Sequence, residues 1–135
     1  MTAFLDTNVL ISLLDGNAQF HDWCVEAVQR KRAEGPALIS DIVFCEFSIG
    51  MPDLESVVSA IRDLDLERIR ASDRALFRAG TALREYKMKH GGPKSSVLPD
   101  FLIGAEAAVQ GLPLITANPK DFVNYFPEME VIRPE

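Results

Sequence analysis

Four acidic side chains lie in segments that are otherwise almost entirely apolar. Asp6, Asp100 and Asp121 are near the starts of expected helices, and Glu46 is in the middle of one. Burial of an unpaired carboxylate costs several kcal/mol and normally forces protonation or pairing with a cation. A cation bound by all four side chains would remove this cost. The pattern therefore predicts one metal site assembled from residues far apart in the sequence.

The donor atoms near these acids suit a hard divalent cation. Carboxylates together with neutral oxygen donors are preferred by Mg²⁺ or Mn²⁺, which also keep several bound waters. The neutral partners that could support the site are Thr7, Asn8, Thr116 and Asn118. We expect Asp6 and Asp100 to bind the metal directly. Glu46 and Asp121 then bind it directly or through water.

Each acid also has a purely structural interpretation. Asp6, Asp100 and Asp121 could be helix caps or first-turn acids, which the helix dipole favours. Glu46 is harder to explain in this way, because it lies in mid-helix between Cys45 and Phe47. Glu46 therefore distinguishes best between a metal site and simple capping.

Size and composition limit the class of protein. With 135 residues, of which 47% are hydrophobic, the chain is long enough for one domain over residues 1–135 with a sizeable core. A net charge of −6 argues against a protein that coats nucleic acid through bulk positive charge, but not against one that cuts it. No segment approaches the roughly 20 apolar residues that span a bilayer. We therefore expect a cytoplasmic protein without membrane association.

Short apolar strands alternate with helices along the chain. Strands are expected at 3–5, 37–39, 66–70, 113–116 and 131–132, with helices between them. This alternation indicates βαβ units, and so an α/β fold with a parallel sheet covered on both faces. Ligands bind at the carboxyl ends of such strands, where Asp6 and the segment 116–121 are expected to meet. Cys24 and Cys45 lack metal-binding spacing and are expected to be reduced, mostly buried thiols.

Four motifs in this order resemble those of PIN-domain ribonucleases. They are LDTNVL at 5–10, the helix with Glu46, DFLIGA at 100–105 and LITANPKDF at 114–122. The resemblance covers nearly the whole chain, and within the family the chain is most similar to the VapC-type toxins of bacterial toxin-antitoxin pairs. It implies a PIN-like three-layer α/β/α fold with a central parallel sheet of about five strands.

The same resemblance implies an activity. It indicates a Mg²⁺- or Mn²⁺-dependent endoribonuclease whose catalytic residues are Asp6, Glu46, Asp100 and Asp121. A bound cation in such a site can activate a water, align it with a phosphate and offset charge on the leaving oxygen. Ala117 occupies a place where these toxins frequently have arginine, and Asn118 stands where many PIN domains have aspartate. The fourth acidic role therefore falls to Asp121.

By resemblance, the partners are an RNA substrate, a second copy of the chain in a homodimer, and a cognate antitoxin protein whose tail enters the acidic site. The apolar helices at 44–49 and 54–61 are candidates for the antitoxin groove. Candidate RNA contacts are Lys87, Lys89 and Lys94, which surround a loop just before Asp100. The alternative for these lysines is an exposed basic helix end that complements the dipole.

Two other functions remain open from the sequence. A phosphoaspartyl hydrolase also has an aspartate after a strand, but it requires Asp-x-Asp, and the third position here is Asn8. A non-catalytic PIN-like binding module would keep the fold without the chemistry. The four acids weaken that alternative, whereas Asn118 keeps it open.

Overall fold

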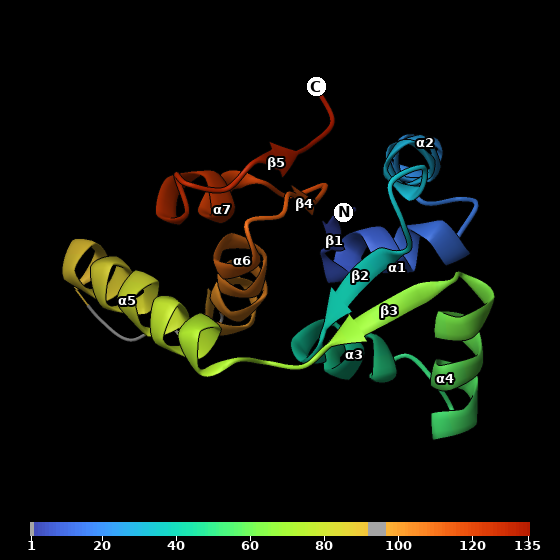
Figure 1. The fold of residues 1–135 in the computed structure, drawn as a ribbon, viewed down its shortest axis with the longest axis horizontal. Coiled ribbons are helices and arrows are strands. Elements are labelled where there is room, and N and C mark those ends of the chain that lie inside the picture. The colour runs from blue at the N-terminus through green and yellow to red at the C-terminus, as the bar shows by residue number, and fades with distance from the viewer. Residues whose placement is uncertain (1, 92–96) are drawn as a thin grey trace.

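Strands and helices alternate along the chain (Figure 1). The computed structural model describes residues 2–91 and 97–135. The strands are β1 (Phe4–Leu5), β2 (Ala37–Ser40), β3 (Leu66–Ile69), β4 (Leu114–Ile115) and β5 (Val131–Ile132). The helices are α1 (Thr7–Leu14), α2 (His21–Arg32), α3 (Asp41–Ser48), α4 (Leu54–Asp63), α5 (Asp73–His90), α6 (Leu98–Gln110) and α7 (Lys120–Tyr125).

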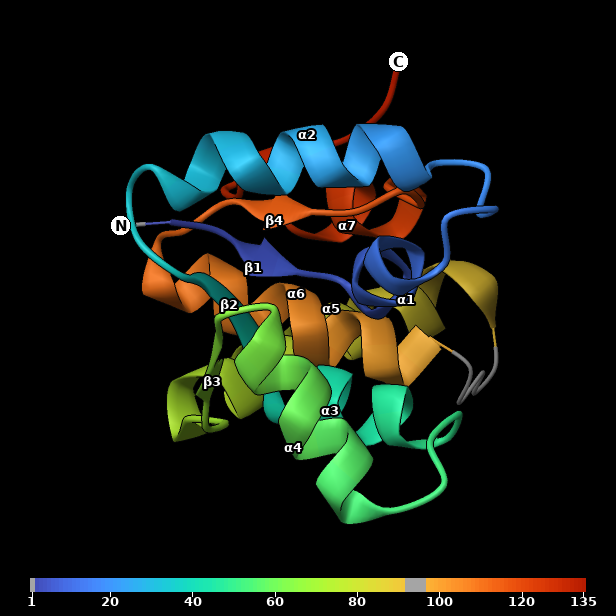
Figure 2. The same ribbon diagram turned by 90° about the vertical axis from the view of Figure 1, so that its right-hand side faces the viewer.

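The five strands form one parallel sheet in the order β3-β2-β1-β4-β5. Helices α1, α2 and α4 lie on one side of this sheet, and α5, α6 and α7 lie on the other (Figures 1 and 2). Both faces are therefore covered, which explains why the inner strands β1, β2 and β4 are almost entirely apolar. The expected α/β fold, with a parallel sheet between helical layers, is confirmed.

Helix α6 is the most deeply packed helix next to the sheet. Phe101, Ile103 and Ala105 are fully buried in it, as its nearly continuous apolar sequence predicts. Gly104 allows the close approach of α7 and the chain after it, because a Cβ atom there would lie 2.8 Å from Cε2 of Phe126. Since α6 begins with the segment that contains Asp100, this packing also fixes that acid relative to the sheet.

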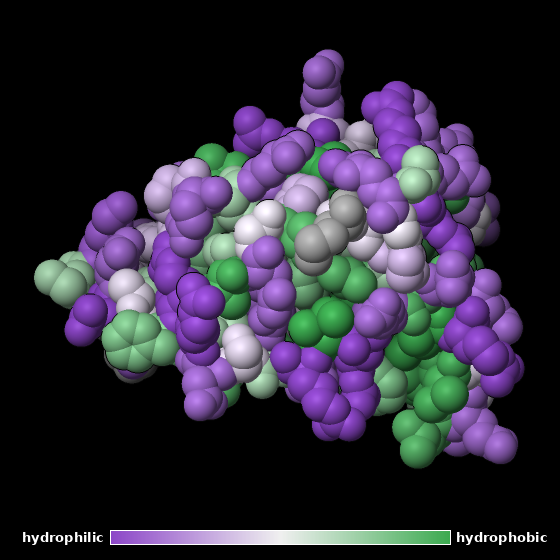
Figure 3. All heavy atoms as spheres, viewed as in Figure 1, coloured by the Kyte–Doolittle hydropathy of each residue, from purple (hydrophilic) through white to green (hydrophobic). Residues whose placement is uncertain are grey.

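Exposed apolar side chains gather over α1, α3 and α4 at one end of the molecule (Figure 3). They are Ile11, Leu14, Ile49, Leu54 and Val58. At the other end, on α5, Leu76, Phe77 and Met88 are exposed singly among charged side chains. Within the described ranges, no helix is both long and apolar enough to cross a membrane.

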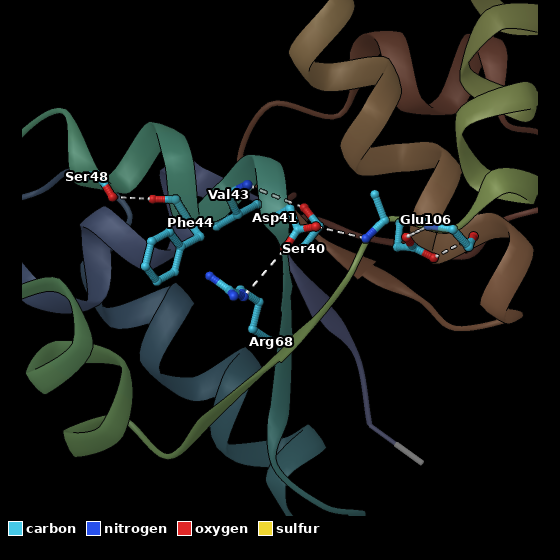
Figure 4. A network of polar contacts seen from close by, with 9 residues as sticks. Ser40, Asp41, Val43, Phe44, Ser48, Arg68 and Glu106 are labelled. Atoms are coloured by element: carbon cyan, nitrogen blue, oxygen red, sulfur yellow. Dashed lines mark hydrogen bonds and ion pairs between the residues drawn. The ribbon is translucent and has the colours of Figure 1, made fainter. Parts of the chain in front are cut away.

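Two carboxylates hold the connection between β3 and α5 (Figure 4). Asp41 accepts a hydrogen bond of 2.9 Å from the backbone N–H of Ala71 and lies 3.4 Å from Nε of Arg68. Glu106 of α6 is buried and accepts a hydrogen bond of 3.2 Å from the backbone N–H of Ser72, the residue that caps α5. These bonds satisfy backbone donors where the chain leaves the sheet.

The two cysteines differ in their surroundings. Cys24 is buried in α2, as expected, whereas Cys45 is exposed. The expectation for Cys45 was wrong because it rested on apolar neighbours in sequence. In α3 the buried residues Val43 and Phe47 define the inner face, and Cys45 lies on the other side of the helix.

Candidate active site at the carboxyl edge of the sheet

The candidate site begins where the neighbouring strands β1 and β4 end. Leu5 pairs with Ile115 in the parallel register, so Asp6 and Thr116 both follow this pair at the same edge. The backbone N–H of Asp6 donates to the carbonyl of Ile115 over 3.0 Å. The sheet therefore brings two polar residues from distant parts of the chain into contact, at the edge where ligands bind in α/β folds.

The Asp6 carboxylate is buried and accepts three hydrogen bonds. Its side chain is only 4% exposed. Oδ1 accepts from the backbone N–H of Thr7 over 2.7 Å, while Oδ2 accepts from Nδ2 of Asn8 over 3.1 Å and from Oγ1 of Thr116 over 2.7 Å. The bond to Thr7 caps α1, so Asp6 is a helix cap as the structural interpretation predicted. Capping accounts for only one of its three hydrogen bonds. The other two bonds orient the remaining oxygen.

The neutral residues beside Asp6 form one connected network. Oδ1 of Asn8 accepts from the backbone N–H of Ala117 over 3.2 Å, and Oγ1 of Thr116 accepts from the backbone N–H of Asn118 over 3.0 Å. Asn118 thus contributes its backbone, while its side chain is exposed. The network links the start of α1 to the turn after β4 and fixes the orientation of the Asp6 carboxylate.

Glu46 reaches the site from α3 through a bond to α1. Oγ1 of Thr7 donates to Oε1 of Glu46 over 2.6 Å. This contact turns a partly buried glutamate toward the carboxyl edge of the sheet. Thr7 therefore connects the Asp6 backbone region with the second acid, a link between residues 39 positions apart.

Asp100 receives the electrostatic effect of all the other acids. The pKa of its carboxyl is raised from 3.8 to about 6, mainly by burial and then by the negative charges of Asp6, Glu46 and Asp121 in that order. Burial likewise raises the pKa of Asp6, against hydrogen bonds that lower it, and Glu46 adds to the rise. The four acids predicted from sequence are therefore close enough to interact electrostatically.

The donor set suits a divalent cation by its chemistry. It consists of carboxylate and hydroxyl oxygens, and none of the ion pairs between described residues involves any of the four acids. The mutual repulsion of these carboxylates favours a bound cation. In the described part of the chain the side chains do not, as they stand, close into a group of three or more that could hold an ion. A cation would therefore have to draw them together.

The basic end of α5 lies near the helix that contains Asp121. Lys87 and Lys89 are in its last turn and exposed, and Nζ of Lys89 lies 5.4 Å from the ring centroid of Tyr125 in α7. Asp121 raises the pKa of the Tyr125 hydroxyl, after the larger effect of burial. Lys94, the third predicted RNA contact, lies outside the described residues. The proximity of Tyr125 to Asp121 was not predicted from the sequence, although Tyr125 lies one helical turn after Asp121.

An open hollow of about 590 Å³ adjoins the acids between α1 and α3. Its wall is mostly apolar, and Thr7 and Glu46 form its end nearest the site. The apolar lining includes Ile11, which is 49% exposed, and Ile49, which is 84% exposed. The site therefore has a polar acidic floor at the sheet edge and an apolar extension beside it.

The structure has a parallel sheet between helical layers, with acidic side chains gathered at its carboxyl edge. A comparison with known protein families identifies the class to which this arrangement belongs. Residues 3–125 match the PIN domain family, and the chain therefore belongs to it. The resemblance carried by the sequence motifs is confirmed. The match also favours this interpretation over a phosphoaspartyl hydrolase.

The chain is 34% identical over 131 residues to Ribonuclease VapC10 of Mycobacterium tuberculosis. The aligned region covers 96% of this chain and 90% of the relative. Its fold is similar to a toxin-antitoxin complex from Klebsiella pneumoniae, with a TM-score of 0.69, 32% identity and coverage of 99% and 98% of the two chains. It is also similar to VapBC2 from Rickettsia felis bound to a promoter DNA fragment, with a TM-score of 0.72, 23% identity and 98% coverage of each.

Proposed function

We propose that this PIN-domain chain is a metal-dependent endoribonuclease that hydrolyses RNA phosphodiester bonds and acts as the toxin of a toxin-antitoxin pair. The observation that carries the proposal is the convergence of three negative charges on the partly buried carboxyl of Asp100 without a pairing cation among the described residues. The 34% identity to a relative named as a ribonuclease supports the same conclusion.

The proposed roles follow from the contacts. Asp6 and Asp100 are the direct metal ligands, and Glu46 and Asp121 act directly or through water. When bound, Mg²⁺ or Mn²⁺ supplies an activated water and offsets charge on the leaving oxygen. Thr116 and Asn8 hold Asp6 in one orientation, and Thr7 does the same for Glu46. The supporting role of Asn118 is exerted through its backbone N–H.

Substrate and partner contacts are proposed on either side of the acids. Lys87 and Lys89 at the end of α5 are the proposed contacts for RNA phosphates. The apolar hollow between α1 and α3 is the proposed seat of an antitoxin segment, since it opens directly beside Glu46. A solved relative that is 32% identical is a toxin-antitoxin complex, which supports such a partner. We further propose that residues 1–135 form a single nuclease domain that works as a homodimer.

The decisive experiment is cleavage of a defined RNA pool in the presence of Mg²⁺ or Mn²⁺ and in the presence of a chelator. The variants Asp6→Asn and Asp100→Asn should each reduce cleavage by about 100-fold or more, because each removes a charged ligand. Asp22→Asn is the matched control, since Asp22 is an exposed first-turn acid of α2. Metal-independent cleavage, or cleavage that survives both substitutions, would exclude the mechanism.

One observation favours a non-catalytic binding module as the second candidate. The described acids do not close into an ion-binding group as they stand. Calorimetric titration with Mn²⁺ separates the two candidates. Binding that disappears in Asp6→Asn supports the nuclease, whereas absence of any divalent binding to the wild type supports the binding module.

A further inference from the structure

A second hollow, of about 550 Å³, lies between α2 and the chain that follows β5 (Figure 1). Its apolar part is formed by Trp23, Ala27 and Ile132. The charged side chains that complete the lining are Glu26, Arg30, Lys31, Arg133 and Glu135. This hollow shares no lining residue with the one beside Glu46, and the mechanism proposed above does not use it.

The register of the sheet places one end of this hollow at the carboxyl edge. Ile115 pairs with Ile132, and the backbone N–H of Thr116 donates to the carbonyl of Ile132 over 3.0 Å. Arg133 therefore follows β5 at the edge where Thr116 follows β4 and Asp6 follows β1. Because β5 is two strands from β1 and neighbouring strands are about 4.8 Å apart, the backbone of Arg133 is about 10 Å from that of Asp6 along this edge. A strand of RNA held at the acids can extend directly into the hollow.

Arg133 is the cation of this hollow that the fold leaves available. Its side chain is exposed and forms no ion pair with the residues that the structure describes. Arg30, by contrast, is paired with Glu26, and Nζ of Lys31 lies 3.3 Å from Oε2 of Glu34. The lining has more basic than acidic side chains, although the net charge of the chain is −6. The charge of the hollow therefore suits a phosphate group.

Trp23 provides an aromatic surface beside this cation. The side chain is partly buried against the core, and the rest of it lines the hollow. Its place is fixed by α2, whose buried residues are Cys24, Ala27 and Val28. Single-stranded nucleic acids are bound by basic grooves with aromatic side chains, on which any base can stack. The hollow thus combines a contact for a base with a contact for a phosphate.

We propose that this hollow binds one nucleotide of the RNA strand, with the base against Trp23 and a phosphate at Arg133. The inference rests on the RNA cleavage proposed above and adds a contact surface between α2 and β5 to it. Continuity with the acids along the carboxyl edge favours an RNA strand over a free nucleotide as the occupant. The strand is unpaired at this point, because the bases of a duplex stack on one another and cannot enter the hollow.

The first test uses Trp23 as its own probe. It is the only tryptophan in the chain, so its fluorescence reports on this hollow. A single-stranded RNA of mixed sequence, added to the full chain with a chelator that keeps the RNA intact, should quench this fluorescence as it saturates the protein. Adenosine monophosphate should require about 100-fold higher concentration or more, because it lacks the other contacts of the strand. Equal potency of the two assigns the hollow to a free nucleotide and overturns the proposal, as does absence of quenching by both.

The second test measures the stacking contact by fluorescence anisotropy of labelled RNA. Trp23→Ala should raise the dissociation constant by about fivefold or more, which is the typical effect of losing one stacked base. Trp23→Phe keeps an aromatic ring and should bind RNA more tightly than Trp23→Ala. Thermal unfolding verifies that both variants fold. A dissociation constant that is unchanged in Trp23→Ala overturns the stacking contact.

The third test concerns the phosphate contact and does not depend on a change in the core. Arg133→Gln should reduce the slope of the logarithm of the binding constant against the logarithm of the salt concentration by about 0.7, the contribution of one phosphate in a single strand. Arg62→Gln is the matched control, because the side chain of Arg62 on α4 is 72% exposed and should leave the slope unchanged. Equal slopes for the two variants overturn the contact at Arg133.

The outcomes separate this inference from the proposed nuclease. RNA cleavage together with wild-type binding by Trp23→Ala and Arg133→Gln overturns the subsite and leaves the nuclease standing. Binding that depends on Trp23 and Arg133, without any cleavage in Mg²⁺ or Mn²⁺, overturns the nuclease and leaves the RNA-binding hollow standing.

Discussion

Oγ1 of Thr116 donates a hydrogen bond of 2.7 Å to Oδ2 of Asp6, although the two residues are 110 positions apart. Thr116 is fully buried, and its hydroxyl also accepts from the backbone N–H of Asn118. One hydroxyl therefore connects the carboxylate after β1 to the turn after β4. The orientation of the proposed metal ligand depends on the C-terminal part of the chain.

Thr116→Val should lower RNA cleavage by about 10- to 100-fold, as loss of a group that orients a ligand typically does. Thr116→Ser keeps the hydroxyl and should retain most of the activity. The measurement is the initial cleavage rate at several Mn²⁺ concentrations, with thermal unfolding to verify that both variants fold. Equal rates for the valine and serine variants would show that the hydroxyl has no part in orienting Asp6.

The stability of the metal-free protein should depend on pH through Asp100. Its pKa is raised from 3.8 to about 6 in the folded protein, so folding favours the neutral carboxyl. The resulting stabilisation is complete below the unfolded value and is lost as the pH rises through about 6. Asp100→Asn should therefore gain stability relative to the wild type over this interval.

Urea unfolding in the presence of a chelator, from about pH 4 to about pH 7, measures this difference. Asp63→Asn is a suitable control, because the side chain of Asp63 is 72% exposed. A constant difference between Asp100→Asn and the wild type across the interval would contradict the expected titration.

Divalent metal should stabilise the wild type and not Asp6→Asn. A ligand present at 100 times its dissociation constant stabilises the folded state by about 2.7 kcal/mol. Mn²⁺ should therefore raise the melting temperature of the wild type by several degrees above about pH 6, where Asp100 is ionised. If Asp6→Asn shows the same increase, the stabilising ion binds elsewhere.

Gly104→Ala should destabilise the fold by about 1 to 3 kcal/mol, as overpacking of a core does. The added Cβ would lie 2.8 Å from Cε2 of Phe126 and 3.0 Å from Cδ1 of Phe122, and both rings are buried. Gly50→Ala is the control, because a Cβ atom there meets nothing within 4 Å. Chemical denaturation compares the two, and equal free energies of unfolding would show that α7 moves away easily.

The parts of the site that could be predicted from sequence depend on local patterns. Asp6 and Asp100 were recognisable because each stands at the start of an apolar helix that follows or faces a strand end. The alternation of short strands and helices was sufficient to predict a parallel sheet between two layers of helices. These features come from periodicity and capping, which short stretches of sequence contain.

Contacts between distant elements could not be predicted in the same way. The bond from Thr7 to Glu46 depends on how α1 and α3 cross, and the use of the Asn118 backbone depends on the turn after β4. Glu106 gave no signal of its role either, since it holds Ser72, which lies 34 positions away. Such pairings depend on tertiary packing, which cannot be predicted from local sequence patterns.

The strand order has a consequence for the life of the chain in the cell. β1 emerges first from the ribosome, but its neighbour β4 is made near the end, after α6 with Asp100. During synthesis Asp6 is therefore made long before its hydrogen-bond partner Thr116. A chain that stops before Asp121 cannot assemble the four acids. A chain that stops before β4 has neither Thr116 nor Asp121, so it lacks both the group that orients Asp6 and the fourth acid of the proposed site.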